Sequence, residues 1–229
     1  MRRALVVGNS AGIGLALTKR LLQSGCHVWG VSRSTSEIEH PVYQHLICDV
    51  TSSEYPVALR LLLDTTGGFD VCVYCAGIGE FLDLEDMTSE VAVFRTNLLS
   101  LVETTSLVIP AMLARGSGHL IGLSSIGDQV ISADAPSYSA SKSGVSSYLA
   151  GLALALRPRG IAVSNVRLGF VDTKMAKGPV RPFMIGIERA VDVLMRCLKH
   201  RPARLTHPWR MEILVRILRW ATRLRLARG

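Results

Sequence analysis

Short apolar segments alternate with longer amphipathic segments along almost the whole chain. A short apolar run bounded by turn residues is typical of a buried strand, whereas apolar positions three and four apart are typical of a helix. This alternation predicts one α/β domain. The predicted strands are residues 4–7, 27–32, 44–50, 69–77, 119–125, a segment starting at 161, and 203–208. The predicted helices are residues 12–24, 53–66, 88–115, 136–158 and a last helix over 208–229.

The first strand leads into a glycine-rich turn with the sequence LVVGNSAGIGLAL. Gly8 lets the chain reverse, Gly12 lets the backbone approach a phosphate, and Gly14 lets the next helix pack on the strand. Free N–H groups at the start of that helix would face a pyrophosphate. The pattern predicts a dinucleotide-binding turn. A glycine-rich loop before a helix can also be an ordinary turn, so the downstream residues decide between the two.

The second strand ends in Ser32 and Arg33, without an acidic residue. In a dinucleotide-binding fold a carboxylate here would accept hydrogen bonds from the adenosine ribose, whereas an arginine can pair with a 2′-phosphate. The hydroxyls of Ser34 and Thr35 lie beside it in the sequence. We therefore predict that NADP(H) is preferred over NAD(H). The alternative is that Arg33 is an ordinary exposed loop arginine.

Three later strands also end in polar or small residues. Asp49 ends the third strand, Ala76 and Gly77 end the fourth, and Ser124 and Ser125 end the fifth. Ligands of open α/β sheets bind outside the carboxyl ends of the strands. We therefore expect these residues to lie near the glycine-rich turn.

The helix predicted over 136–158 carries Tyr138 and Lys142 four residues apart, so both side chains lie on one face. A phenol has an unperturbed pKa near 10, and a neighbouring ammonium lowers that pKa by favouring the phenolate. A lone pair at this spacing is usually accidental. Here it follows a glycine-rich turn and a strand-end serine, which favours acid–base chemistry.

These residues together resemble the short-chain dehydrogenase/reductase family over nearly the whole chain. The matching positions are Gly8, Gly12, Gly14, Asp49, Cys75-Ala76-Gly77, Asn97, Ser125, Tyr138 and Lys142. The resemblance implies a Rossmann-like doubly wound parallel sheet of about seven strands with helices on both faces. It also implies an NAD(P)-dependent oxidoreductase that acts on a carbonyl or alcohol.

The mechanism that the resemblance implies is hydride transfer between nicotinamide C4 and a carbonyl carbon, with Tyr138 moving the proton. Lys142 would lower the pKa of Tyr138 and hold the nicotinamide ribose, Ser125 would orient the carbonyl oxygen, and Asn97 would hold a water. Ser125 could instead cap a loop, and Asn97 could bond a helix carbonyl. The implied cofactor-binding residues are Gly8, Asn9, Ser10, Gly12, Ile13, Gly14, Arg33, Asp49, Val50, Ala76, Gly77, Tyr138, Lys142, Gly169, Val171 and Thr173. No metal site is expected.

Several positions depart from the family pattern. Val7 stands where threonine is usual, Tyr74 and Cys75 replace asparagines, and Leu168 replaces the proline before Gly169. The side chains at positions 7, 74 and 75 normally brace the turn, but none is a reacting group. The departures leave a second hypothesis, an NADP-binding regulatory or scaffold protein of this fold without turnover.

The segments that follow the strand ends are expected to form the substrate pocket. They are Gly79–Leu82, Asp128–Ile131, Leu168–Phe170 and Lys174–Ile185. Val130, Ile131, Phe170 and Phe183 predict an apolar ligand. The sequence does not name the molecule.

The net charge of +8 is unevenly distributed. Residues 196–229 carry ten Lys and Arg and one acid, a net charge of +9, whereas residues 1–195 carry −1. No nucleic-acid partner is expected, because basic residues do not interleave with aromatic residues along a recognisable module. Five scattered cysteines suit reduced, buried thiols. With no signal-peptide pattern at the N-terminus, the expected location is the cytoplasm.

Residues 208–229 are predicted as a basic amphipathic helix appended to a single domain over 1–207. Arg216, Arg219 and Arg223 gather on one side of a helical wheel and apolar residues cover the rest. Arginines at this spacing exclude a simple transmembrane span. The apolar face either packs on the body or on a second subunit, or it lies on an anionic membrane surface. We expect packing, with peripheral membrane contact as the alternative.

A homodimer or homotetramer is also expected. In the family, the helices that carry Asn97 and Tyr138 commonly pair with their mates in a second subunit. The apolar, small-residue faces of 98–113 and 143–156 suit such packing.

Overall fold

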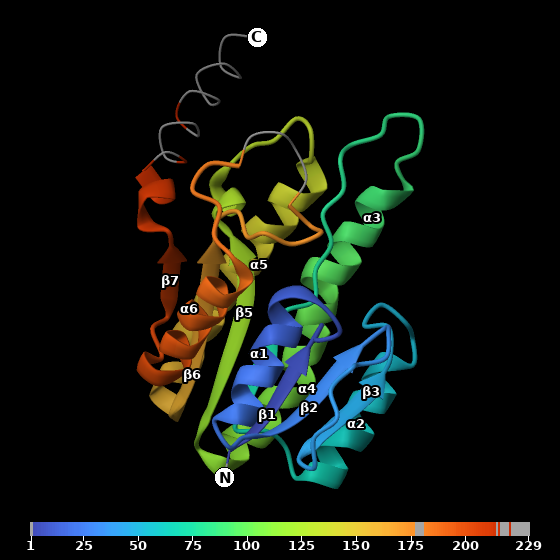
Figure 1. Ribbon diagram of the computed structural model, residues 1–229, viewed down its shortest axis with the longest axis vertical. Helices are drawn as coiled ribbons and strands as arrows, with labels where there is room; N and C mark the ends of the chain where they lie inside the picture. Colours follow the sequence, from blue (N-terminus) through green and yellow to red (C-terminus); the bar gives the residue numbers. More distant parts are fainter. Residues whose placement is uncertain (1, 177–180, 214, 216–219, 221–229) are drawn as a thin grey trace.

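The computed structural model describes residues 2–176, 181–213, 215 and 220. One sheet of seven strands runs in the order β3-β2-β1-β4-β5-β6-β7 (Figure 1). The strands are β1 (Arg3–Val7), β2 (His27–Ser32), β3 (Tyr43–Ile47), β4 (Val71–Tyr74), β5 (Gly118–Ser125), β6 (Ile161–Leu168) and β7 (Arg204–His207). Every neighbouring pair is parallel, so all carboxyl ends lie on one edge. The predicted doubly wound parallel sheet is confirmed.

Helices cover both faces of the sheet (Figure 1). One face carries α1 (Gly12–Gln23) and α6 (Ile187–His200), and the other carries α2 (Tyr55–Thr66), α4 (Ser100–Arg115) and α5 (Pro136–Leu156). Buried side chains on the first face include Leu17, Leu21, Val191 and Leu194. Buried side chains on the second face include Leu59, Leu101, Val108, Met112 and Leu149. Burial of these two apolar layers drives the fold.

The order of the strands reverses at β1, which pairs with β2 on one side and with β4 on the other. Such a reversal leaves a crevice outside the carboxyl ends of the two strands, because the connections leave in opposite directions. The glycine-rich turn after β1 and the Ala76-Gly77 segment after β4 meet at this crevice.

The segment predicted as one helix over 88–115 is helical throughout but contains a π-helical turn. α3 (Thr88–Phe94) passes into the π-turn η1 (Arg95–Leu99), which holds Asn97, and then into α4. Turns of this kind often occur at functional sites. The helix is long and apolar enough to cross a membrane by length and composition alone. Its buried side chains nevertheless pack on the sheet, as in the core helix of a globular domain.

Several element bounds differ from those predicted. β3 ends at Ile47 and β4 at Tyr74, so Asp49 and Ala76-Gly77 lie in the loops beyond these strands. No helix was predicted over α6, although its buried positions follow a helical period. Short 3-10 turns, η2 (Ile126–Gln129) and η3 (Arg157–Arg159), follow β5 and α5. All five cysteines are free thiols.

The described start of the C-terminal segment is helical and packs on the body. Residues 209–213, 215 and 220 are helical, and the rest of 208–229, including the predicted arginine face at 216, 219 and 223, lies outside the described residues. Met211 and Val215 are buried against Ile126, whereas Trp209 and Ile213 are exposed. Side chains four residues apart lie on one face of a helix, so this helix has an inner and an outer face.

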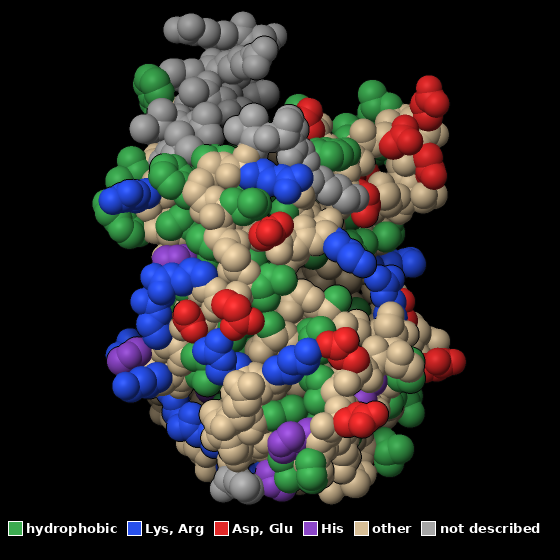
Figure 2. Space-filling model, viewed as in Figure 1, with side chains coloured by type: hydrophobic (Ala, Val, Ile, Leu, Met, Phe, Trp, Pro, Cys, Tyr) green, Lys and Arg blue, Asp and Glu red, His purple; other side chains and the backbone are tan. Residues whose placement is uncertain are grey.

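Basic side chains gather on the part of the surface formed by the C-terminal region, as the excess of Lys and Arg in residues 196–229 indicates. Figure 2 shows Lys and Arg side chains gathered over α6 and β7, where Arg189, Arg196 and Arg204 are exposed. Acidic side chains lie over the loop that precedes α3, where Asp83 and Asp86 are exposed.

Candidate active site

A cavity of about 1100 Å³ opens at the carboxyl ends of the strands. Its walls come from the turn after β1, the ends of β2, β4, β5 and β6, the start of α5 and the loop beyond β6. The predicted site residues that line it are Gly8, Ser10, Gly12, Ile13, Gly14, Arg33, Asp49, Val50, Ala76, Gly77, Ser125, Tyr138, Lys142, Gly169, Val171 and Thr173. Two predicted site residues, Asn9 and Asn97, lie outside the lining.

The turn after β1 requires glycine for steric reasons. Gly8 has a φ of 85°, and a Cβ there would lie 2.5 Å from the backbone nitrogen of Ala76. A Cβ at Gly14 would lie 2.0 Å from the carbonyl oxygen of Gly8. α1 begins at Gly12 without a side-chain cap, so its first N–H groups are available to an anion. The turn therefore fits a dinucleotide pyrophosphate.

Asn9 faces the sheet and not the cavity. Its side chain is fully buried, and its Nδ2 donates a 2.8 Å hydrogen bond to the hydroxyl of Tyr43 on β3. A Cβ at Gly30 would lie 2.0 Å from the same Nδ2, so Gly30 makes room for the amide. The Asn9 side chain thus joins the turn to β2 and β3, and the expected contact of this residue with the cofactor stays a prediction.

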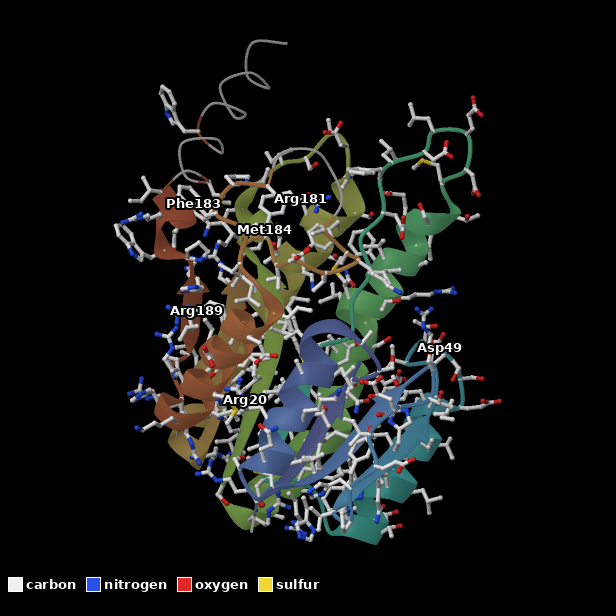
Figure 3. The ribbon with its side chains drawn as sticks, viewed as in Figure 1. Arg20, Asp49, Arg181, Phe183, Met184 and Arg189 are labelled. Carbon is white, nitrogen blue, oxygen red and sulfur yellow. The ribbon has the colours of Figure 1, made fainter. Side chains whose placement is uncertain are left out.

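Arg33 and Asp49 face each other across the ends of β2 and β3. The Arg33 guanidinium lies 3.9 Å from the Asp49 carboxylate, and the Arg33 side chain is 69% exposed. The Oδ1 atom of Asp49 also accepts 2.8 Å hydrogen bonds from the backbone and hydroxyl of Thr51. Asp49 therefore has a fixed orientation, whereas Arg33 is held by one exposed ion pair. Figure 3 labels Asp49 at the right of the view, near the ends of β2 and β3.

Tyr138, Ser125 and Lys142 meet at the centre of the cavity. The Ser125 hydroxyl hydrogen-bonds the Tyr138 side chain and accepts a 3.0 Å bond from the Gly127 backbone. A Cβ at Gly79 would lie 3.2 Å from the Tyr138 ring, so a glycine here leaves room for the ring. The Lys142 ammonium lies 5.8 Å from the ring centre.

The protein environment shifts the pKa of both titratable groups. Burial raises the pKa of the half-buried Tyr138 phenol, and the bond from Ser125 opposes this shift. Burial lowers the pKa of Lys142 to about 8. The expected lowering of the Tyr138 pKa by the ammonium is thus not the dominant effect in the cofactor-free protein, because desolvation of the phenol is larger.

Asn97 is buried behind this group. Its Oδ1 accepts a 2.8 Å bond from the Ile78 backbone nitrogen, and its Nδ2 donates to the Ile78 carbonyl at 2.9 Å and to the Ser141 hydroxyl at 3.0 Å. Both ends of the amide have protein partners. Asn97 therefore fixes the loop after β4 against α5, and its expected water-binding role stays a prediction.

The loop beyond β6 supplies the other side of the cavity. Gly169, Val171 and Thr173 all line it, as the sequence predicts. The Thr173 methyl lies 3.6 Å from the position that a Cβ at Gly12 would take. This loop therefore approaches the glycine-rich turn closely.

Much of the remaining wall is apolar. It includes Phe81, Ile126, Val130, Phe170, Met175, Met211 and Val215. The predicted pocket segments contribute only in part, since Leu82, Ile131 and Phe183 do not line the cavity. Phe183 is 52% exposed, and Figure 3 shows it beside Met184 at the end of the molecule that bears the C-terminal helix.

Asp128, expected in the substrate pocket, instead faces away from it. Its carboxylate forms two hydrogen bonds with the fully buried Arg167 on β6, 2.6 Å from Nε and 2.5 Å from Nη2. Sequence reasoning missed Arg167, although an arginine inside an apolar strand indicates a buried partner. It also missed Met211 and Val215, whose four-residue spacing was the available signal.

Comparison with known proteins agrees with this geometry. Residues 2–181 match the short chain dehydrogenase family. The 3-oxoacyl-[acyl-carrier-protein] reductase of Vibrio cholerae is 30% identical over 76% of this chain and 75% of that protein. The acetoacetyl-CoA reductase of Allochromatium vinosum is 31% identical over 76% of each chain. The crystal structure of a short chain dehydrogenase from Burkholderia cenocepacia in complex with NADP superposes with a TM-score of 0.86, covering 98% of this chain and 97% of that chain at 23% identity.

The match extends over most of the chain and includes the glycine-rich turn, the Ser125 strand end and the Tyr138–Lys142 helix face. The chain therefore belongs to the short-chain dehydrogenase family, a family of NAD(P)-dependent oxidoreductases.

Proposed function

We propose that this protein is an NADP-dependent oxidoreductase that transfers a hydride between the nicotinamide and a carbonyl or alcohol carbon of an apolar substrate. The observation that carries the proposal is the meeting of Tyr138, Ser125 and Lys142 inside a cavity whose one side is a phosphate-binding turn and whose other side is apolar. The reductase names of the two curated relatives support carbonyl reduction as the reaction.

The residues of this chain have distinct parts in the proposed reaction. The Tyr138 hydroxyl moves a proton to or from the substrate oxygen, and the Ser125 hydroxyl hydrogen-bonds that oxygen and orients it. Lys142 favours the phenolate electrostatically when its ammonium is charged. Asn97 positions the loop after β4 and the start of α5 through its three hydrogen bonds. The cofactor supplies or accepts the hydride when bound.

Residues around the turn would hold the cofactor. The backbone at Gly8, Gly12 and the start of α1 suits the pyrophosphate. Val50, Ala76 and Val171 line the space beside it. One solved structure of this fold is in complex with NADP and another has bound NAD+, so the fold accommodates both cofactors. Arg33 at the end of β2 supports NADP(H), because its guanidinium can pair with a 2′-phosphate.

The apolar wall supports a substrate with an apolar portion beside the reacting carbonyl. Phe81, Val130 and Phe170 offer surface of this kind. We further propose a cytoplasmic homodimer or homotetramer, supported by the exposed apolar side chains of Leu99 on the long helix and Leu154 on α5.

NADPH oxidation tests the proposal. Purified protein is incubated with NADPH and a panel of aldehydes, ketones, quinones and acetoacetyl-CoA. The expected result is turnover of at least one carbonyl and its loss in Tyr138→Phe. Tyr148→Phe is the matched control, because Tyr148 lies on the same helix but bonds Thr105 away from the cavity. Tight NADPH binding without turnover of any carbonyl would instead support a regulatory or scaffold protein.

A further inference from the structure

The C-terminal helix contributes two side chains to the cavity. Met211 and Val215 are 5% and 3% exposed, and both line the space that also holds Ser125 and Tyr138. They pack on Ile126, the residue directly after Ser125. Ile213, on the same helix, is 54% exposed and points away.

This helix lies close to the end of β6. A Cβ at Gly169 would lie 3.3 Å from Pro208, 3.4 Å from Ile126 and 3.7 Å from Met211. The Gly169 nitrogen donates a 2.9 Å hydrogen bond to the His207 carbonyl oxygen. A Cβ at Gly169 would already be in contact with these three residues, so the glycine leaves room for the helix beside the end of β6, where Met211 lines the cavity.

A buried cation ties the helix to the loop after Ser125. Arg167 forms two hydrogen bonds with Asp128 in η2, and its Nη1 lies 3.5 Å from the Glu212 carboxylate of the C-terminal helix. The side chain of Arg167 is 1% exposed, that of Asp128 4% and that of Glu212 21%. Glu212 also accepts a 2.9 Å bond from the exposed Arg204. Arg167, in contact with both carboxylates, thus fixes the helix relative to the loop that follows the predicted substrate-orienting serine.

We infer that the C-terminal helix is part of the substrate site: Met211 and Val215 form the wall that meets the apolar portion of the substrate, and Glu212, acting through Arg167, is the positioning residue that holds this wall. The inference rests on the proposed function for its substrate, a carbonyl compound with an alkyl chain. A protein side chain at this wall limits the length of the substrate's alkyl chain that fits beside the reacting carbonyl.

Straight-chain methyl ketones from butanone to dodecanone test the wall. Met211→Ala is expected to raise kcat/KM for the longest ketones relative to butanone by about tenfold. Met211→Trp is expected to shift the preference to shorter chains. Ile213→Ala, on the outer face of the same helix, is the matched control and keeps the wild-type profile. Val215→Ala carries the same test if Met211→Ala fails to fold.

Glu212→Gln tests the positioning role. The expected result is a KM for long ketones raised about fivefold with kcat for butanone unchanged. A loss of kcat for every ketone would indicate a general structural effect and overturn this role. Arg204→Gln leaves the contact between Glu212 and Arg167 in place and is expected to keep the wild-type profile.

Binding separates this inference from the proposed function. Thermal stabilisation of the NADP+-loaded protein by straight-chain alcohols of increasing length measures which chain lengths fit against the wall, and it does not depend on turnover. A length preference that moves with Met211 but without turnover of any carbonyl supports the wall and contradicts the proposed enzyme. A length profile that is identical in wild type, Met211→Ala and Met211→Trp overturns the inference.

Discussion

The Lys142 ammonium lies 5.8 Å from the centre of the Tyr138 ring and donates a 3.0 Å hydrogen bond to the Leu123 carbonyl oxygen. Burial lowers the pKa of Lys142 to about 8 and raises the pKa of Tyr138. The same desolvation therefore favours the neutral form of both groups. The ammonium that would assist Tyr138 is therefore mostly charged only at a pH below its pKa of about 8 in the cofactor-free protein.

Lys142→Met is expected to stabilise the cofactor-free protein at neutral pH while abolishing the proposed activity. The pKa of Lys142 is about 8 when folded and near 10.4 when unfolded, so the unfolded state binds more protons between these values. Stability therefore rises with pH across this window, and the full desolvation penalty remains below it. The penalty is on the order of 3 kcal/mol. Urea unfolding of the wild type and of Lys142→Met at pH 7 and pH 10 measures the stabilisation and its pH dependence.

Lys19→Met is the control for that substitution. Lys19 is exposed and pairs with Glu37 at 2.7 Å, so its removal is expected to change the free energy of unfolding by less than about 1 kcal/mol. A Lys142→Met variant no more stable than wild type at neutral pH would show that burial does not penalise this ammonium.

Arg33→Ala is expected to narrow the preference for NADPH over NADH. The loss of charge-assisted hydrogen bonds to the 2′-phosphate corresponds to about 1.5 to 3 kcal/mol. The affinity for NADH should change little, because its ribose carries no phosphate. Fluorescence titration measures both dissociation constants. Arg60→Ala, an equal loss of charge on the exposed face of α2, should leave them unchanged. Equal affinity of the wild type for the two cofactors would refute the assignment.

The Asp128–Arg167 pair is expected to show strong non-additivity. Arg167→Ala leaves the Asp128 carboxylate, which is 4% exposed, without its cation, and this is expected to lower the free energy of unfolding by about 3 to 5 kcal/mol. Asp128→Asn combined with Arg167→Met removes both charges and should be less destabilising than the sum of the single changes. Additive effects in chemical denaturation would contradict the coupling.

Light scattering at micromolar concentration is expected to report a dimer or tetramer. Leu99 is 57% exposed and Leu154 80% exposed on the helices expected to pair. Leu154→Arg should shift the protein toward monomer, because it places a charge in the apolar interface. Leu61→Arg, at a 68% exposed position on α2, should leave the mass unchanged. A monomeric wild-type protein would contradict the expected pairing.

Sequence reasoning succeeded where a local rule decides the position. Gly14 is required by a contact within the turn and Gly8 by its φ of 85° there, and Tyr138 and Lys142 share a face because of helical spacing. The doubly wound parallel sheet followed from the alternation of elements together with the family resemblance. These features depend on neighbours along the chain, so periodicity and glycine placement predict them.

Sequence reasoning did not predict the side-chain positions that contacts between distant segments decide. Asn9 turns into the sheet because Tyr43 and the space above Gly30 receive its amide. Arg167 is buried because a carboxylate from η2 and one from the C-terminal helix meet it. No pattern within the turn or within β6 contains that information.

Transfer of deuterium from NADPH that carries deuterium at both hydrogen positions of nicotinamide C4 tests the central proposal most directly. The substrate is a carbonyl that the wild type turns over, and mass spectrometry of the alcohol product measures the label. The account predicts one deuterium on the former carbonyl carbon, with a rate lowered by about 100-fold to 10,000-fold in Tyr138→Phe and unchanged in Tyr148→Phe. An unlabelled product, or a Tyr138→Phe variant as fast as wild type, would contradict it.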